Sequence, residues 1–169
     1  MNKAVFLDRD GIINVDKSYV GQIKDFEFSS GIFEVLKYLQ SLGYKIIIVT
    51  NQSGIGRGYY TKKDFENLTD WMIEEFAKKD IHICEVYYCP HVPEENCECR
   101  KPNAQMLESA IKKYDLDTDN SWMIGDKPSD IEAGLKANIP NTIFINTTVN
   151  QTAKYNAKTI LDIINIIKK

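Results

Sequence analysis

The chain has 169 residues, a net charge of −3 and 27% charged residues, a balance without the basic footprint of a nucleic-acid-binding protein. Its longest apolar stretch, residues 46–49, is far too short to span a bilayer, so we expect a soluble protein without a membrane partner. This length allows one domain over residues 1–169 with a full hydrophobic core. The first residues lack the pattern of a signal peptide, which predicts a reducing, cytoplasmic location and four cysteines that do not form disulfides.

Short apolar runs alternate with helical patterns along the chain. Strands are predicted at residues 5–7, 45–49, 85–88, 122–124 and 142–145. Helices are predicted over residues 33–42, 61–76, 104–114, from 129 onward, and over 160–167. The polar segment 150–157 is expected to be loosely held. This alternation predicts an α/β fold, a doubly wound parallel sheet with helices on both faces.

Two carboxylates, Asp8 and Asp10, follow the first predicted strand directly, and Gly11 lets the chain turn after them. Side chains two residues apart in an extended chain point the same way, so both carboxylates can face one metal and one substrate. The carboxyl ends of strands in an open α/β sheet border the crevice where ligands bind. Alone, such a pair is more often a solvated turn or part of a calcium loop.

Three more polar clusters fall at predicted strand ends or before a helix: Thr50-Asn51-Gln52-Ser53 with Gly54, Gly56 and Gly58; Arg100-Lys101; and Gly125-Asp126-Lys127 with Asp130. Each has a plain interpretation, as a helix cap, a solvated charge or a turn. Together they bring carboxylates, ammonium groups and a hydroxyl to one edge of the sheet, where the glycines let backbone N–H groups approach an anion. A carboxylate nucleophile, Mg²⁺ on hard oxygen ligands and cationic donors are what phosphoryl transfer requires.

These motifs resemble those of the haloacid dehalogenase superfamily phosphatases, over roughly residues 4–146. More narrowly, segments 13–16, 25–28, 50–55 and 87–91 are similar to the heptose 1,7-bisphosphate 7-phosphatases and the related histidinol-phosphatases. The chain departs from the family pattern in two places. Ile12 replaces the usual threonine after Asp-x-Asp-Gly, and the five residues between His91 and Cys97 are similar to the short loop of histidinol-phosphatases.

The resemblance implies a Mg²⁺-dependent phosphatase that removes the 7-phosphate of D-glycero-D-manno-heptose 1,7-bisphosphate, in the synthesis of ADP-heptose for the lipopolysaccharide core. Asp8 would form an aspartyl phosphate and Asp10 would act as general acid and base. Thr50 and Lys101 would steady the phosphoryl oxygens. Magnesium would be held by Asp8, by Asp126 and by Asp10 through its main-chain carbonyl. The residues expected to contact the substrate are Asp16, Tyr19, Asn51, Gln52, Ser53, Arg100 and Lys127.

The pairs Cys89-x-His91 and Cys97-x-Cys99 have the spacing of a closed Cys3His site, in which soft ligands favour structural Zn²⁺. The alternatives are a disulfide or a plain polar loop. Zinc on the loop 89–99 would fix the exit at Arg100. Cys84 has no spaced partner and is expected to be a small core residue.

Several other residues are expected to have structural roles. Trp71 and Trp122 are predicted to belong to the core or its margin, and His82 to the surface. The pair Tyr59-Tyr60 either lines the mouth of the site or covers a helix end.

Only 49 residues separate Thr50 from Arg100, and one helix, one strand and the zinc loop occupy them. No separate cap domain fits there, so short loops around the site must provide the substrate specificity. We expect a monomer that acts on a small sugar phosphate. Histidinol phosphate is the alternative substrate. An alternative of another class is a zinc-binding interaction module without catalysis. The set of Asp8, Asp10, Lys101 and Asp126 argues against it, because binding alone does not need a nucleophile.

Overall fold

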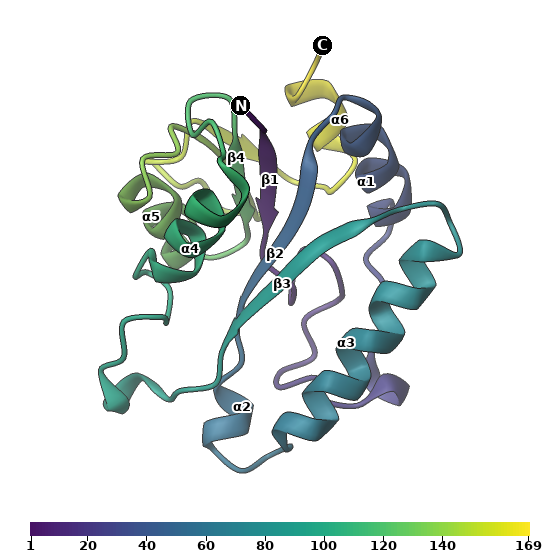
Figure 1. Cartoon of the computed structure of the whole chain (residues 1–169), viewed down its shortest axis with the longest axis vertical. Coiled ribbons are helices and arrows are strands. Elements are labelled where there is room, and N and C mark those ends of the chain that lie inside the picture. The colour runs from purple at the N-terminus through teal and green to yellow at the C-terminus, as the bar shows by residue number, and fades with distance from the viewer.

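In the computed structural model, which describes residues 1–169, six strands form one sheet at the centre of the molecule (Figure 1). The strands are β1 (Ala4–Leu7), β2 (Lys45–Asn51), β3 (Ile83–Cys89), β4 (Trp122–Gly125), β5 (Asn141–Ile145) and β6 (Tyr155–Ala157). Their order is β3-β2-β1-β4-β5-β6, and every neighbouring pair is parallel. The five predicted strands are therefore confirmed, with β1 inside the sheet between β2 and β4.

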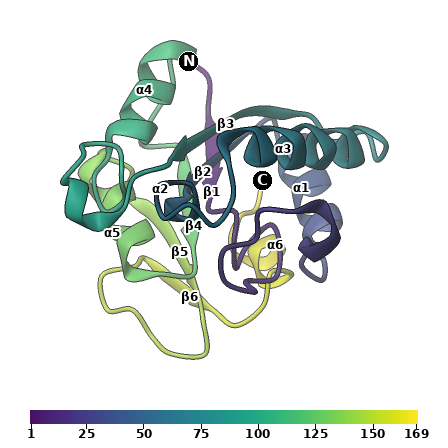
Figure 2. The same ribbon diagram turned by 90° about the horizontal axis from the view of Figure 1, so that it is seen from below.

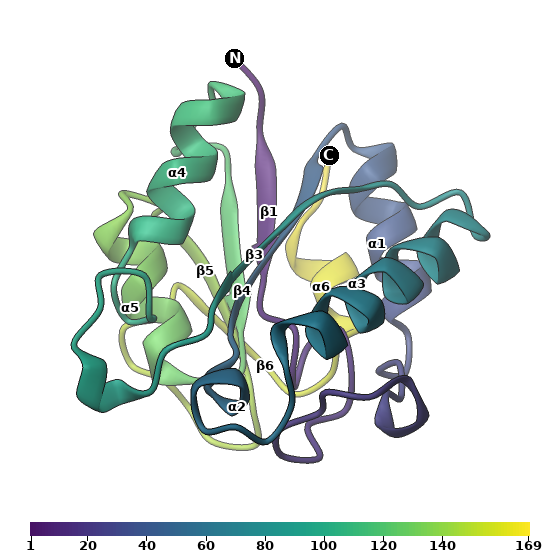
Figure 3. The same cartoon turned by 60° about the horizontal axis from the view of Figure 1, so that its bottom comes forward.

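Helices cover both faces of this sheet. They are α1 (Ile32–Ser41), α2 (Ser53–Gly56), α3 (Lys62–Ala77), α4 (Gln105–Tyr114), α5 (Pro128–Lys136) and α6 (Asp162–Ile166), with 3₁₀ turns η1 (Ile23–Asp25) and η2 (Pro93–Glu95). Figures 1 and 3 show α4 and α5 on one face and α1, α3 and α6 on the other. The doubly wound fold is confirmed. No helix is long and apolar enough to cross a lipid bilayer.

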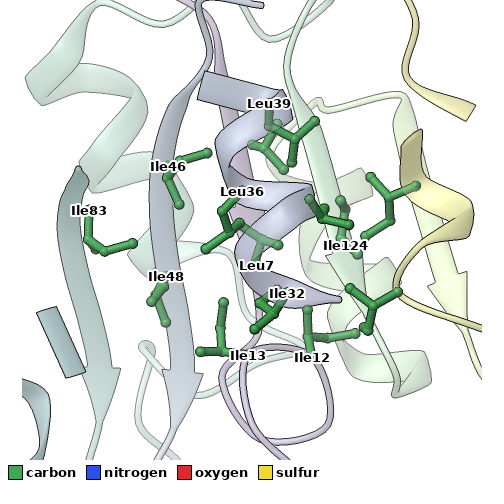
Figure 4. Close-up of a cluster of buried hydrophobic side chains, with 14 of the residues drawn as sticks. Leu7, Ile12, Ile13, Ile32, Leu36, Leu39, Ile46, Ile48, Ile83 and Ile124 are labelled. Atoms are coloured by element: carbon green, nitrogen blue, oxygen red, sulfur yellow. The ribbon is translucent and has the colours of Figure 1, made fainter. Parts of the chain in front are cut away.

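Alternate residues of the strands serve two separate cores. Val5 and Leu7 pack with α1, α3 and α6, whereas Ala4 and Phe6 pack with α4 and α5. Figure 4 shows α1 directing Ile32, Leu36 and Leu39 toward the strands in the larger core. Because both faces of the central strands are buried, they read in the sequence as continuous apolar runs.

The expectation that residues 150–157 are loosely held is wrong. Tyr155–Ala157 form β6 and pair with Ile143–Ile145 of β5. The Tyr155 ring also lies 5.7 Å from the ring of Trp122. An edge strand of three residues needs little apolar sequence to pair, so its polar composition concealed it.

The carboxyl ends of β1, β2 and β4 meet at one edge of the sheet. Figure 2 looks at that edge and shows the three strands close together, with α2 in front of them. The predicted polar clusters that follow these strands are thereby gathered in one place.

Candidate active site

A cavity of about 540 Å³ opens at this edge of the sheet. Most of its lining residues are polar or charged, unlike the mostly apolar lining of typical small-molecule pockets. Most of the predicted site residues line it: Asp8, Asp10, Asp16, Tyr19, Asn51, Gln52, Ser53, Arg100, Lys101 and Lys127. Such a lining suits a small, highly charged ligand.

The ammonium group of Lys101 is buried between two carboxylates. Its Nζ donates hydrogen bonds to Oδ1 of Asp8 at 2.9 Å, to Oδ1 of Asp130 at 2.6 Å and to the Val49 carbonyl at 2.7 Å. The main chain of Lys101 exchanges two hydrogen bonds with the side-chain amide of Asn51. Burial alone would lower the pKa of Lys101, but the charges of Asp130 and Asp8 raise it, so the ammonium stays charged.

Asp8, Asp126 and Asp130 form a cluster of carboxylates whose ligand atoms lie within 4.8 Å of one another. Burial and the charge of Asp130 raise the pKa of Asp8 to about 6. Burial and the charge of Asp8 raise the pKa of Asp126 to about 7. The Oδ1 atom of Asp126 is buried and has no hydrogen-bond partner. Crowded carboxylates with an unpartnered oxygen fit a hard divalent cation such as Mg²⁺.

The carboxylate of Asp10 is not part of this cluster. It accepts hydrogen bonds from Arg9, Asn14 and Gln52 at 2.9–3.2 Å. Burial raises the pKa of Asp10, but the charge of Arg9 and these hydrogen bonds outweigh it and hold the pKa below its ordinary value. These contacts hold the carboxylate of Asp10 apart from the cluster, and the predicted metal contact is made by its main-chain carbonyl.

The hydroxyl of Thr50 lies beneath the cavity. Thr50 is fully buried, and its Oγ1 accepts a hydrogen bond from Nε2 of Gln52 at 2.8 Å. The same amide donates to Asp10, and its oxygen accepts the hydroxyl of Tyr60. Gln52 therefore links the predicted phosphate-binding hydroxyl to Asp10.

Charged and aromatic side chains form the rim of the cavity. Nζ of Lys127 lies 3.8 Å from carboxylate oxygens of Asp16 and Asp126 and 3.9 Å from Asp8. Of the two alternatives for the tyrosine pair, lining the site holds for Tyr60. Tyr60 is buried and lines the cavity, whereas Tyr59 is exposed and packs edge-on against Tyr19.

The structure gives Gly54 and Gly56 a reason other than anion approach. A Cβ atom on Gly54 would lie 2.2 Å from the Tyr60 ring, and one on Gly56 would lie 2.7 Å from the Pro90 carbonyl oxygen. Both glycines let neighbouring segments pack closely around the cavity.

Gly11 provides a test of the carboxylate cluster. Its φ is +97°, and a Cβ there would lie 2.0 Å from Oδ2 of Asp126. We expect Gly11→Ala to displace that carboxylate and weaken Mg²⁺ binding by at least about tenfold, as measured by isothermal titration calorimetry. Gly58→Ala is the matched control, because Gly58 has a φ of +77° and nothing within 4 Å. Equal losses in both variants would show that backbone strain alone is responsible.

Cys89, His91, Cys97 and Cys99 gather at the end of β3 as predicted. Their sulfur atoms lie 2.6–3.6 Å apart, and Nδ1 of His91 lies 3.3 Å from Cys99 and 3.5 Å from Cys89. Nε2 of His91 lies 3.8 Å from a carboxylate oxygen of Glu95, which is too far for a hydrogen bond. All four cysteines of the chain are free in this structure.

The remaining expectations concern the core and the surface. Trp122 is buried and Trp71 is partly buried against the larger core, as predicted. His82 is exposed, which is also confirmed. Cys84 is half-buried and packs at the margin of the smaller core.

Sequence reasoning gave no role to three residues that hold the site together. Asp130 is fully buried, and its two oxygens bind Lys101 and the main-chain N–H of Lys127. Its spacing of four residues from Asp126 was a usable signal. Arg9 and Asn14, which bind Asp10, were given no role because their spacing in the sequence does not indicate a contact with Asp10, although Asn14 lies in the family-like segment 13–16.

Comparisons with known proteins agree with this fold. A HAD-hydrolase-like family model matches residues 98–164. The crystal structure of a D,D-heptose 1,7-bisphosphate phosphatase from B. bronchiseptica, complexed with magnesium and phosphate, superposes with a TM-score of 0.87. The superposition covers 95% of this chain and 95% of that chain, and the two sequences are 23% identical, so the similarity supports the fold. The fold is therefore that of the HAD-like hydrolases.

Two curated relatives narrow the class to a family. A D-glycero-beta-D-manno-heptose-1,7-bisphosphate 7-phosphatase of Helicobacter pylori is 54% identical over 145 residues, which cover 85% of this chain and 84% of the relative. The D-glycero-alpha-D-manno-heptose-1,7-bisphosphate 7-phosphatase of Campylobacter jejuni is 50% identical over 168 residues. The aligned residues cover 99% of this chain and 96% of the relative. The chain belongs to the family of the D-glycero-D-manno-heptose 1,7-bisphosphate 7-phosphatases.

Proposed function

We propose that this protein hydrolyses the 7-phosphate of D-glycero-D-manno-heptose 1,7-bisphosphate. The observation that carries the proposal is the buried chain of Asp8, Lys101 and Asp130 at the cavity floor, with Asp126 beside it. An ionised carboxylate, a fixed ammonium and a cation site are the parts that phosphoryl transfer needs. We infer the substrate from the names of the relatives. The reaction would belong to the synthesis of ADP-heptose for lipopolysaccharide.

In this mechanism Asp8 attacks phosphorus and forms an aspartyl phosphate as the bond to the sugar oxygen breaks. Asp10 protonates that oxygen and then removes a proton from the water that hydrolyses the intermediate. Asp8, Asp126 and the main-chain carbonyl of Asp10 would hold Mg²⁺, which neutralises phosphoryl charge when bound. Lys101 holds Asp8 in place and steadies the phosphoryl oxygens.

Specificity comes from the rim and from the strand-end loops. We assign substrate contacts to the following residues: Asp16, Tyr19, Asn51, Gln52, Ser53, Arg100 and Lys127. The amides of Asn51 and Gln52 are already bonded to Lys101 and Asp10, so they act on the substrate mainly through those residues. Thr50 remains a predicted phosphoryl contact, and its buried hydroxyl would act from beneath the cavity floor.

We assign structural Zn²⁺ to Cys89, His91, Cys97 and Cys99. Because Arg100 and Lys101 follow Cys99 directly, this metal would hold the two cations in place. The same cluster is the only support for the alternative of a zinc-binding interaction module. Residues of one chain complete both sites, so we propose a monomer acting in the cytoplasm, where thiols stay reduced.

A comparison of substrates tests the proposal. Purified protein with Mg²⁺ is assayed against the alpha and beta anomers of heptose 1,7-bisphosphate and against histidinol phosphate, with phosphate release as the measurement. We expect the highest kcat/KM for a heptose bisphosphate. A preference for histidinol phosphate would overturn the heptose assignment and retain the mechanism, and activity on none of them would favour the interaction module.

Arg100 is expected to recognise the distal part of the substrate. It lines the cavity, and the one hydrogen bond of its guanidinium, to the His91 carbonyl, is 3.5 Å long, so the planar fork is free to meet a second phosphate. Arg100→Ala should lower kcat/KM for the bisphosphate by about 10- to 100-fold, and much less for p-nitrophenyl phosphate.

Lys136→Ala is the control for Arg100→Ala, because it removes one positive charge from an exposed position on α5. It should leave both substrates unaffected. Equal losses on both substrates in Arg100→Ala would assign Arg100 to the chemistry or to the zinc loop instead of recognition.

A further inference from the structure

A buried arginine stands directly behind the carboxylate of Asp10. Arg9 is 1% exposed, although it lies between two aspartates of the cavity. Its Nε donates to Oδ2 of Asp10 at 3.2 Å and its Nη2 donates to Oδ1 at 2.9 Å. One planar group therefore contacts both oxygens, which fixes the plane of the carboxylate as well as its position.

Two aromatic rings face the guanidinium of Arg9, whose Nη1 is buried without a hydrogen-bond partner. The faces of Phe26 and Phe65 lie 5.8 and 5.9 Å from its Cζ atom, where aromatic rings attract a cation. Burying a guanidinium is costly, and an apolar side chain of similar size would fill the same space without that cost. The position of Arg9 is thus explained by its hydrogen bonds better than by packing.

Arg9 also joins Asp10 to the loop that carries rim residues. Its Nη2 donates to the main-chain oxygen of Val20 at 2.6 Å, and Val20 follows Tyr19 of the cavity lining. Asn14 donates to Oδ1 of Asp10 and Gln52 donates to Oδ2, both at 3.0 Å. Both oxygens of Asp10 are thereby held from two sides, and Arg9 is the one donor that reaches both.

We propose that Arg9 is a positioning residue, which orients the carboxylate of Asp10 for proton transfer to the leaving oxygen. This inference rests on the proposed function, in which Asp10 is the general acid. A proton donor matters more for a basic leaving oxygen than for a weakly basic one. Loss of its orientation should therefore steepen the dependence of the rate on the leaving group.

The test compares phenyl phosphate with p-nitrophenyl phosphate, which share a small apolar leaving group but differ in the basicity of its oxygen. The measurement is kcat/KM, because it covers the steps up to phosphoryl transfer onto Asp8. For Arg9→Met we expect a loss of about 10²-fold on phenyl phosphate and of less than about tenfold on p-nitrophenyl phosphate. Arg9→Lys keeps a buried cation but lacks the planar fork that contacts both oxygens of Asp10. We therefore expect this variant to keep the Tm of the wild type and to show the same selective loss of kcat/KM on phenyl phosphate as Arg9→Met.

Met72→Ala is the control for loss of stability, because Met72 is buried on α3, the helix that carries Phe65, and makes no hydrogen bond to Asp10. It should lower the Tm and leave the ratio of the two kcat/KM values unchanged. An unchanged ratio in both Arg9 variants, or full activity in Arg9→Lys, would overturn the role of Arg9. A wild-type protein that hydrolyses neither compound would instead contradict the proposed function.

Discussion

Asp8→Asn is expected to reduce kcat by about 10⁴-fold or more, the scale seen when a catalytic nucleophile is removed. An amide does not attack phosphorus and is a poor ligand for Mg²⁺. The fold should survive the change. Because the pKa of Asp8 is raised in the folded protein, its ionised form is disfavoured there, and a neutral side chain relieves repulsion from Asp126 and Asp130.

Phosphate release and the Tm of the variant together check this expectation. Asp117→Asn is a suitable control, because Asp117 lies half-buried on the loop before β4 and its carboxylate accepts hydrogen bonds only from the nearby Asp119 and Asn120. It should keep full activity. Residual activity of Asp8→Asn above a few per cent of the wild type would remove Asp8 from the role of nucleophile.

The two metals are expected to respond differently to removal. Brief treatment with EDTA should stop activity and added Mg²⁺ should restore it, whereas one zinc ion per chain should remain through gel filtration. Structural zinc contributes on the order of 10 kcal/mol to folding. Cys97→Ser should therefore lower the Tm by about 10 °C or more before it affects the chemistry.

Cys84→Ser provides the matched cysteine control, because Cys84 lies outside the Cys/His cluster. It should retain zinc and lose little stability. Elemental analysis by mass spectrometry measures the metal content, and calorimetry measures the Tm. Wild-type protein without near-stoichiometric zinc would refute the site.

The main features of the fold could be predicted because the central strands are buried on both faces. The apolar runs that end at Leu7 and at Ile124 locate β1 and β4, and the polar residues that follow them mark the cavity. The order of β2, β1 and β4 in the sheet was not needed for this step, because every parallel strand presents its carboxyl end at the same edge.

Side-chain partners could not be predicted in the same way. Spacing brings Asp8 and Asp10 to one loop, but only the folded chain shows that the first faces Lys101 and the second faces Arg9. Side chains two residues apart point the same way only in an extended chain, and after the strand ends their directions depend on the backbone angles. β6 escaped prediction for a related reason, since its pairing depends on the open edge of β5 and not on its own composition.

The Cys/His cluster would allow one loop to vary in length while a neighbouring catalytic residue stays in place. Asn96 has a left-handed φ of +50° at the exposed tip of the segment between His91 and Cys97. If the metal ligands fix both ends, residues can be inserted beside Asn96 at a small entropic cost and without moving Lys101. Evolution or protein engineering can thus change the length of this exposed segment while Arg100 and Lys101 keep their positions at the cavity.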